Sequence, residues 1–370
     1  MNYKEILFFI AKCLTISLEE KNKKEIEHLL KTTEIDWDNL VKVSTAHYVF
    51  PALYCNLKHA NFLHYLPEEL VNYMIHITDL NRERNQQIIT QAKEINELLL
   101  SNNITPIFLK GTGNLLEGLY ADIAERMVGD IDFIFSKKDY PRAIEILTSN
   151  SYSKVSKDSY EFPQFKHYSR LQKENRIAAV EIHKELLIEK YADEFNYEFV
   201  VKDAQKINDI HFLSFENQLC LSIISNQIND HGMQYKKIAL RNAYDVFLLS
   251  QKTDTKKAVK RFEKLFNPLN NFLSICYIAF GEIESIGFEQ NDESKKQIQA
   301  FERSITDLKF ANNHSKKTNL IIFSKSRLNI IYKSIFNKDH RTWLFKRTTD
   351  KNWQREKLVQ LGLKKTKPNP

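Results

Sequence analysis

Glycine and proline are scarce in this sequence, which has only eight of each among 370 residues. Their scarcity favours long regular elements over extended loops. Cysteine is also rare, and its four positions are far apart, with no Cys-x-x-Cys pair: Cys13, Cys55, Cys220 and Cys276. Scattered cysteines in apolar surroundings are typical of reduced core residues, so we expect a cytoplasmic protein without a structural zinc site.

Long hydrophobic runs are absent as well. The apolar stretch nearest the N-terminus, Ile6 to Ala11, is far too short to span a bilayer, and the segment has no cleavage signature. The hydrophobic fraction of 42% and the charged fraction of 27% are ordinary for a globular protein. We therefore expect a soluble chain of two or three domains with no transmembrane segment.

The charge is distributed unevenly. From Ser315 to the end the chain has 15 basic and 3 acidic side chains, whereas residues 1–314 have 39 basic and 44 acidic ones. The basic tail also contains Trp343, Phe345 and Trp353. It has three interpretations: it binds nucleic acid, it lies on an acidic membrane or protein surface, or it is a solvated helix with its aromatic side chains packed on the body.

Hydrophobic periodicity divides the chain into a helical region (1–100), an α/β core (101–200), a second helical region (201–314) and the basic tail (315–370). In the core, strands are expected at 105–109, 130–135, 152–156, 165–172 and 177–186, with helices at 112–121 and 138–150. The predicted fold class is therefore α+β, a small mixed β-sheet core flanked by N-terminal and C-terminal helical regions.

Half of the glycines fall within nineteen positions: Gly111, Gly113, Gly118 and Gly129. The last of them leads directly into Asp130-Ile-Asp132. On a strand, alternation places both carboxylates on one face and Ile131 on the other. Adjacent carboxylates repel each other unless a cation lies between them. This pattern predicts a metal site for Mg²⁺, with Mn²⁺ as the alternative, beside a turn whose backbone can approach phosphate.

A third carboxylate follows in Ala179-Val-Glu-Ile-His183. In this expected strand Val180 and Ile182 share one face, while Glu181 and His183 share the other. If the strand lies beside the one that carries Asp130, Glu181 completes the cation site. His183 would then orient Glu181 or meet a substrate.

These stretches together resemble a known family. Leu109-Lys-Gly111, Arg126-x-x-Gly-Asp-Ile-Asp132 and Val180-Glu-Ile-His183 are similar to the bacterial "uncharacterised nucleotidyltransferases" of the polymerase-β-like superfamily. Ile35-Asp-Trp-Asp-Asn-Leu and Arg241-Asn-Ala-Tyr-Asp-Val-Phe-Leu-Leu also look like stretches of that family, so the resemblance covers roughly residues 35–250. It departs from the wider superfamily at Thr112, where serine is usual, and at Glu181, where aspartate is commoner.

The resemblance implies a metal-dependent enzyme that transfers NMP from an NTP such as ATP to a hydroxyl-bearing acceptor and releases pyrophosphate. It places Asp130, Asp132 and Glu181 in the metal-binding, catalytic carboxylate triad. We expect the nucleotide phosphates to meet the turn and the nearest cations, namely Lys110, Gly111, Thr112, Gly113 and Arg126. A small molecule, a protein side chain and an RNA end all remain open as the acceptor.

Each of these residues also has a purely structural interpretation. Asp-x-Asp occurs at strand edges without metal, Lys110 can cap a strand, and Arg126 can pair with Asp122 or Glu125. His183 can be a supporting residue, and Asp245, a single acid in an apolar helix, can hold that helix against the core by buried hydrogen bonds. His47 and His231 are expected to be ordinary polar or packed histidines. At the level of the whole protein, the alternative is a catalytically silent member that binds nucleic acid or a partner through the basic tail.

Overall fold

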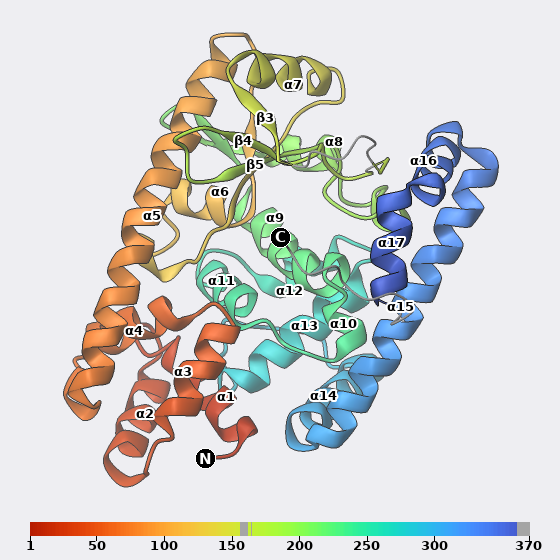
Figure 1. Ribbon diagram of the computed structural model, residues 1–370. Coiled ribbons are helices and arrows are strands. Elements are labelled where there is room, and N and C mark those ends of the chain that lie inside the picture. Colours follow the sequence, from red (N-terminus) through yellow and green to blue (C-terminus); the bar gives the residue numbers. More distant parts are fainter. Residues whose placement is uncertain (156–161, 164, 361–370) are drawn as a thin grey trace, which may run out of the picture. The chain divides into compact units, whose positions relative to one another are not determined.

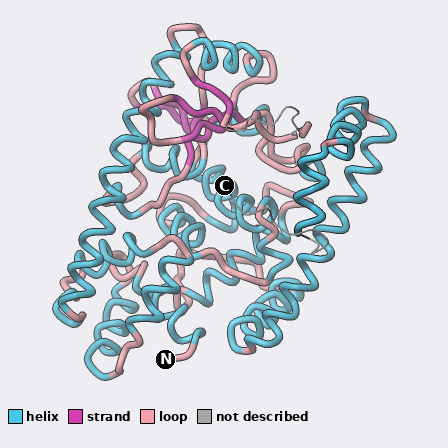
Figure 2. The backbone as a smooth tube through the Cα atoms, viewed as in Figure 1, coloured by secondary structure: helices cyan, strands magenta, loops and turns pink. Residues whose placement is uncertain are grey.

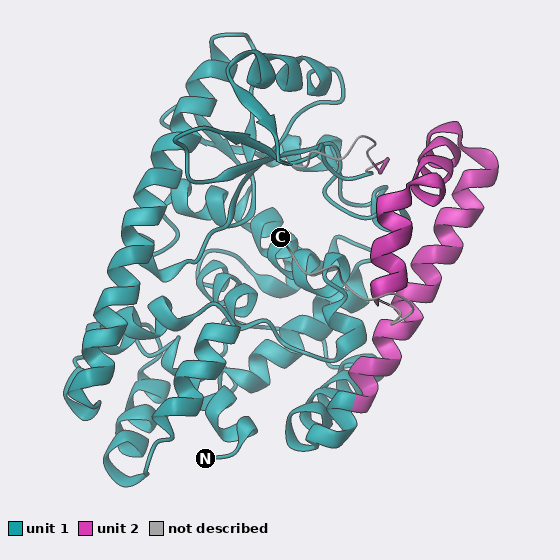
Figure 3. Cartoon of the chain, viewed as in Figure 1, with its two compact units in different colours: residues 1–155, 165–312 teal, residues 156–164, 313–370 magenta. Residues whose placement is uncertain are grey.

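The structure is a computed structural model that describes residues 1–155, 162–163 and 165–360 (Figure 1). The chain forms two compact units (Figure 3). The first unit contains residues 1–155 and 165–312, and the second contains residues 156–164 and 313–370. The candidate site residues named above all belong to the first unit.

The N-terminal region of the first unit is helical, as predicted. The helix α1 begins with a capping box, in which the Asn2 side chain accepts from the Glu5 backbone and the Glu5 carboxylate accepts from the Asn2 N–H. The region ends in a helix of 33 residues, α5, which follows Pro67. Its helices are α1 (Tyr3–Cys13), α2 (Glu20–Thr32), α3 (Trp37–Ala46), α4 (Phe50–His59) and α5 (Glu68–Leu100).

Within the described residues a mixed sheet of seven strands follows, which confirms the predicted α+β class (Figure 2). Its strand order is β3-β4-β5-β2-β1-β7-β6. At the centre, β2 and β5 run parallel, and the side chains of Ile131, Phe133, Val180 and Ile182 are fully buried. The strands are β1 (Ile107–Phe108), β2 (Asp130–Ile134), β3 (Tyr152–Lys154), β4 (Leu171–Lys173), β5 (Ala179–His183), β6 (Gln205–Ile207) and β7 (Ile210–Phe212).

The last two strands were not predicted. They form a hairpin whose two-residue turn, Asn208-Asp209, has positive φ angles of 48° and 62° at its two residues. Asparagine and aspartate tolerate this conformation, so the Asn-Asp pair between short apolar runs was a usable signal. Through β7, which pairs with β1 in parallel, the hairpin extends the sheet beyond the predicted core.

Several predicted boundaries were wrong. Of the expected strand 165–172, only the end belongs to a strand, β4. Before it, His167 forms an isolated bridge with His183. The helix expected at 112–121 is α6 (Lys110–Glu117), which ends at Gly118 in the left-handed conformation, with a φ of 82°. The helix expected at 138–150 is α7 (Tyr140–Ser149). Residue 156, the end of another expected strand, lies outside the described residues.

A row of buried amide side chains on α5 holds the segments that lead into β2 and β5. Asn81 and Asn85 donate to backbone carbonyls of residues 123–126, at distances from 2.6 to 3.3 Å. Gln91 exchanges two hydrogen bonds, of 3.0 and 3.1 Å, with the backbone of Ala178, directly before β5. Because buried backbone groups need partners, these amides fix where both strands begin.

From residue 197 to residue 360 the chain is mainly helical apart from the hairpin. A π-helical segment, Ser225–Asn229, follows α9 directly. The helices are α8 (Tyr197–Val200), α9 (Phe215–Ile224), α10 (Gly232–Tyr235), α11 (Leu240–Ser250), α12 (Thr255–Lys260), α13 (Phe266–Ala279), α14 (Asp292–Thr306), α15 (Leu308–Phe336), α16 (Lys338–Thr349) and α17 (Lys351–Gln360).

The second unit consists mainly of the helices α15, α16 and α17. Phe162 packs against Trp343, with ring centroids 4.9 Å apart. Apolar side chains are nevertheless exposed along α15 and α16: Leu320, Ile321, Phe323, Leu328, Ile331, Tyr332, Ile335, Phe336 and Phe345. Among the described residues, no helix combines the length and the apolar character that crossing a membrane requires.

Helix α11 is held in place by a buried ion pair. Asp245 accepts from Nε of Arg126 at 2.9 and 3.1 Å and from the Tyr120 hydroxyl at 2.8 Å, and Nη2 of Arg126 lies 2.9 Å from its Oδ2. Both side chains are almost completely buried. The structural interpretation of Asp245 therefore agrees with the structure, and Arg126 pairs with neither Asp122 nor Glu125 among the contacts of the described residues.

Replacing Asp245 is expected to destabilise the first unit strongly. Asp245→Ala leaves the Arg126 guanidinium buried and unpaired, which costs about 3–5 kcal/mol in the free energy of unfolding. Urea denaturation measures this cost. The matched control is Asp79→Ala, because Asp79 lies exposed on α5 beside Arg82, and such a pair contributes at most about 1 kcal/mol. Equal losses in the two variants would contradict the role assigned to Asp245.

His47, at the end of α3, joins α3 to α11. Its Nδ1 accepts from the Leu240 N–H at 3.3 Å. Burial, assisted by the charge of Lys237, lowers the pKa of His47 to about 4. As the pH falls, His47 therefore becomes protonated in the unfolded chain before it does so in the folded protein. It does not affect stability above its unfolded pKa, and it destabilises the fold as the pH falls from about 6.5 towards 4.

His47→Gln is expected to remove this part of the acid sensitivity. The free energy of unfolding, measured by urea denaturation from pH 7 to pH 4, should fall less steeply in the variant. The difference from wild type should reach up to ~2 kcal/mol at the acidic end. His59→Gln, a change at an exposed position, is the control. Parallel pH profiles for wild type and His47→Gln would show that His47 is not the group that titrates.

Candidate functional site

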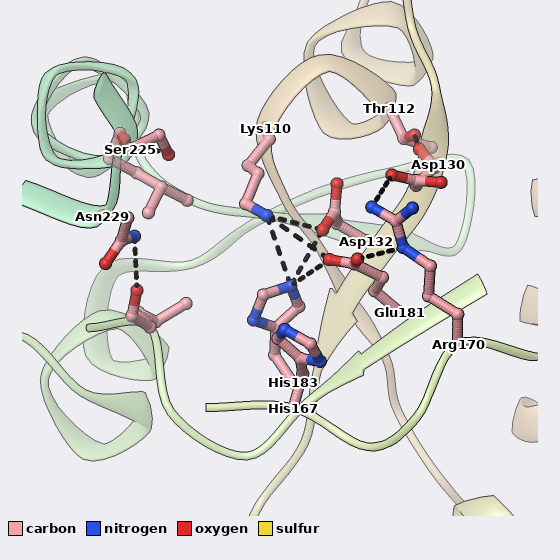
Figure 4. Close-up of polar contacts among 12 residues, drawn as sticks. Lys110, Thr112, Asp130, Asp132, His167, Arg170, Glu181, His183, Ser225 and Asn229 are labelled. Carbon is pink, nitrogen blue, oxygen red and sulfur yellow. Dashed lines mark hydrogen bonds and ion pairs between the residues drawn. The ribbon is translucent and has the colours of Figure 1, made fainter. Parts of the chain in front are cut away.

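The parallel register of β2 and β5 brings two of the predicted carboxylates together. Asp132 lies directly opposite Glu181, and His183 follows two residues later on the same face of β5 (Figure 4). Ligand atoms of Asp132, Glu181 and His183 all lie within 4.8 Å of one another. All three side chains are buried, with at most a tenth of their surface exposed.

Lys110 places its ammonium group among these three side chains. Its Nζ lies 2.7 Å from Oδ1 of Asp132, 3.4 Å from Nε2 of His183 and 4.0 Å from Oε2 of Glu181. The residue stands at the start of α6 with a φ of 53°, a conformation that is uncommon outside glycine. Uncommon backbone conformations concentrate at functional sites, and here one occurs at Lys110, the residue whose ammonium group contacts the cluster.

Arg170 binds two further carboxylate oxygens of the cluster, which Lys110 does not contact. Its Nε donates to Oε1 of Glu181 at 2.6 Å and its Nη2 to Oδ2 of Asp130 at 2.9 Å (Figure 4). Sequence reasoning missed Arg170. It was contained in the expected strand 165–172, and the neighbouring expected strand carries Glu181, so a search for cations opposite the carboxylates would have found it.

Electrostatics within the cluster favour an ionised Asp132. Burial by itself raises the pKa of Asp132, but Lys110 and His183 outweigh it, and the pKa is lowered. Burial likewise lowers the pKa of Lys110, yet Asp132 and Glu181 outweigh that effect and raise it. The pKa of His183 is lowered by burial and by the charge of Lys110, which favours a neutral imidazole.

The charges in direct contact do not cancel. Asp130, Asp132 and Glu181 contribute three negative charges, whereas Lys110 and Arg170 contribute two positive ones. Burial raises the pKa of Asp130, Arg170 opposes this effect, and the neighbouring carboxylates of Glu181 and Asp132 add to it. A cation added to this cluster is therefore favoured by the surrounding field.

The glycine turn packs tightly against the strands. A Cβ atom on Gly113 would lie 2.9 Å from the carbonyl oxygen of Phe108, so only glycine lets α6 approach β1 this closely. A Cβ atom on Gly111 would lie 3.0 Å from Cγ2 of Val128 and 3.6 Å from Cζ of Arg126. The Thr112 hydroxyl donates to the backbone carbonyl of Asp130 at 2.7 Å, which joins the turn to β2.

The structure thus brings together most of the predicted site residues. Lys110, Asp132, Glu181 and His183 are in mutual contact, and Asp130 is connected to them through Arg170. Arg126 is not part of this cluster: it lies behind Gly111 and is paired with Asp245. Its sequence neighbourhood did not reveal this, because its partner is more than a hundred residues away.

Comparison with known proteins agrees with the motifs. Residues 33–280 match the model of a family described as uncharacterised nucleotidyltransferase. The chain is similar to the crystal structure of JHP933 from Helicobacter pylori, with 13% identity and a TM-score of 0.28 over 65% of this chain and 97% of that one. It is also similar to a candidate nucleotidyltransferase from H. pylori, with 14% identity and a TM-score of 0.29 over 65% and 96% of the two chains.

No curated protein sequence matches the chain. The family model, however, covers more than half of its residues, including the turn, both central strands and α11. The resemblance inferred from Lys110-Gly111, Asp130-Ile-Asp132 and Glu181 is thereby confirmed, and the chain belongs to the uncharacterised nucleotidyltransferase family.

Proposed function

We propose that this protein transfers NMP from an NTP to a hydroxyl group of an acceptor, with a divalent metal ion bound at the β2–β5 carboxylates. The observation that carries the proposal is the pairing of Asp132 with Glu181 across two parallel strands, with the Lys110 ammonium between them. An ammonium held between two carboxylates occupies the position that a bound cation would take. The family membership supports the same reaction class.

The donor set fits a divalent cation. Asp132 and Glu181 offer carboxylate oxygens, which suit Mg²⁺ and Mn²⁺, and His183 offers Nε2. Nδ1 of His183 lies 3.3 Å from the Glu185 carbonyl, which can accept its proton when Nε2 is a ligand. We propose Asp130 as a further ligand, because it borders the cluster and its side chain is partly exposed.

The metal, when bound, supplies charge neutralisation at the α-phosphate and lowers the pKa of the attacking hydroxyl. The acceptor oxygen forms a bond to the α-phosphorus, the bond to the β-phosphate oxygen breaks, and pyrophosphate leaves. In this proposal Lys110 and Arg170, displaced from the carboxylates, bind the phosphates. Glu181 orients the acceptor hydroxyl and receives its proton.

The turn at residues 110–113 is the proposed phosphate-binding segment. Lys110, Gly111 and Thr112 form the first turn of α6, where backbone N–H groups have no partner within the helix and favour anions, whereas the Gly113 N–H donates to the Leu109 carbonyl at 3.0 Å. Arg126 lies directly behind Gly111. Its proposed role is to hold the turn and add positive charge from beneath, since Asp245 already occupies its donors.

Removing the ammonium group should strengthen metal binding. Lys110→Met is expected to raise the affinity for Mn²⁺ at least about tenfold, because the metal no longer competes with a bound cation. Asp132→Asn and Glu181→Gln should each weaken it by a similar factor or more. Titration calorimetry, or the electron paramagnetic resonance of free Mn²⁺, measures these affinities.

The control for metal binding is Glu94→Gln, which removes an exposed carboxylate paired with Arg176 on the surface and should leave the Mn²⁺ affinity unchanged. If Lys110→Met binds Mn²⁺ no better than wild type and Asp132→Asn binds it no worse, the cluster is a structural ion-pair network and holds no metal.

Turnover tests the reaction itself. Wild-type protein is incubated with each labelled NTP and Mg²⁺ or Mn²⁺ in the presence of candidate acceptors, and pyrophosphate release is followed. Asp132→Ala and Glu181→Ala are expected to lower the rate by at least about a thousandfold, since charge stabilisation is the main catalytic contribution. Asp209→Ala should retain the wild-type rate.

A catalytically silent protein would give a different set of results. Wild type, Asp130→Ala and Asp132→Ala would then bind nucleotide and metal equally poorly. Binding of RNA or DNA that weakens steeply with salt and disappears on truncation before Ser315 would assign the function to the basic tail instead.

A further inference from the structure

A second polar pocket lies in the first unit beside the carboxylate cluster. It has a volume of about 290 Å³ and is lined by the end of α3, the π-helical segment and the residues that lead into α11. Figure 4 shows Ser225 and Asn229 of the π-helical segment on the side of Lys110 that faces away from Asp130 and Arg170. The charge of Asp230, in the pocket wall, interacts with those of Lys110 and Lys166. The charges of the pocket and of the cluster therefore interact with each other.

Arg241 is the main cation of this pocket. Its guanidinium lies over the ring of Tyr48, with Cζ 5.0 Å from the centroid, so its orientation is fixed. Its Nε is buried, yet it has no hydrogen-bond partner in the part of the chain that the structure describes. Within those residues Arg241 also forms no ion pair, in contrast to Arg126 and Arg170. Since the side chain as a whole is only partly buried and lines the pocket, the rest of its guanidinium is available to an anionic ligand.

The backbone around Arg241 adds to the positive field. Arg241 stands in the first turn of α11, and Ala239 at the helix start provides no side-chain cap. The Leu240 N–H donates to Nδ1 of His47, so the first-turn N–H groups that remain to favour an anion are those of Arg241 and Asn242. On its own this feature is common, but here it coincides with the unpartnered Nε of Arg241 in the same pocket.

The opposite wall is rigid and carries a carboxylate. A Cβ atom on Gly232 would lie 2.7 Å from Oδ1 of Asn226 and 2.8 Å from its carbonyl oxygen, so the chain after the π-helical segment is closely packed. His231 and Lys236 both have φ angles above 50°. Asp230, also in the wall, is an acceptor for hydroxyl groups. The pocket thus contains a cation, Arg241, and a hydroxyl acceptor, Asp230, whose charges interact with each other.

We propose that this pocket binds the acceptor substrate, and that the acceptor is a small hydroxylated molecule carrying a phosphate or carboxylate group, which pairs with Arg241. This inference rests on the proposed nucleotidyl transfer. The volume is at the lower end of the roughly 300–1,000 Å³ of ligand pockets, so it suits a small polar molecule. The triphosphate would lie at the 110–113 turn, so that Lys110 separates the two substrates.

The experiment measures binding of inorganic phosphate, as a probe of the anion position, to protein saturated with Mg²⁺ and a non-hydrolysable NTP. The nucleotide fills the turn at residues 110–113, so remaining phosphate binding reports the second pocket. Arg241→Gln is expected to weaken it at least tenfold, whereas Arg241→Lys weakens it less. Both variants should keep the wild-type affinity for the NTP analogue. Arg176→Gln, at a surface ion pair, is the matched control.

Tyr48→Ala guards against a folding artefact. Tyr48 is about half exposed, so its removal should leave the unfolding midpoint unchanged while it frees the Arg241 guanidinium and weakens phosphate binding several-fold. The proposal is overturned if nucleotide-saturated wild type binds no phosphate, or if Arg241→Gln and Tyr48→Ala bind it as well as wild type. It is also overturned if Arg241→Gln loses the NTP analogue, which would assign Arg241 to the nucleotide.

Failure of the underlying function gives a separate result. If wild type does not bind the NTP analogue with Mg²⁺, nucleotidyl transfer fails, and with it the identification of the ligand as an acceptor. Phosphate titration of the nucleotide-free wild type and Arg241→Gln then still decides whether the pocket is an anion site.

Discussion

The mutual repulsion of three carboxylates in a buried place is the constraint on which the rest of the site depends. Asp132 and Glu181 face each other because β2 and β5 pair in parallel, and Asp130 borders them. Such a cluster is stable only with cations inserted into it, and the chain supplies Lys110 and Arg170 from two different segments. Among the groups in direct contact the carboxylates outnumber the cations by one, and the charge of Lys166 also interacts with Glu181 and Asp132.

Keeping that cluster in register requires support from outside the sheet. The amides of α5 bind the backbone just before β2 and β5, so the long helix sets the start of both strands. Arg126 and Asp245 join the segment before β2 to α11, and the same guanidinium lies behind Gly111. The helical regions on either side therefore support the site directly, because each contributes a buried polar contact that fixes one part of it.

The cations of the carboxylate cluster and of the second pocket differ in their partners, and this difference suggests different roles. Lys110 and Arg170 neutralise carboxylates of the same chain, whereas Arg241 has Tyr48 beneath it and no carboxylate within ion-pairing distance among the described residues. In the proposed function, cations of the first kind become available when a metal replaces them. A cation of the second kind is ready for an anionic ligand from the start, which is why the pocket around it is the better candidate for the acceptor.

Strand alternation and glycine spacing were sufficient to predict the carboxylate face, the glycine turn and the α+β class, because these follow from local geometry within a few residues. The same local rules could not reveal Arg170 opposite Glu181, the burial of Arg126 against Asp245 or the pocket at Arg241. Each of those depends on contacts between segments from 11 to about 190 residues apart, and no periodicity in the chain encodes which segments meet. The sequence by itself predicted that Lys110, the three carboxylates and His183 belong to one site; only the tertiary structure decided which cation neutralises which carboxylate, since that choice depends on burial and distance.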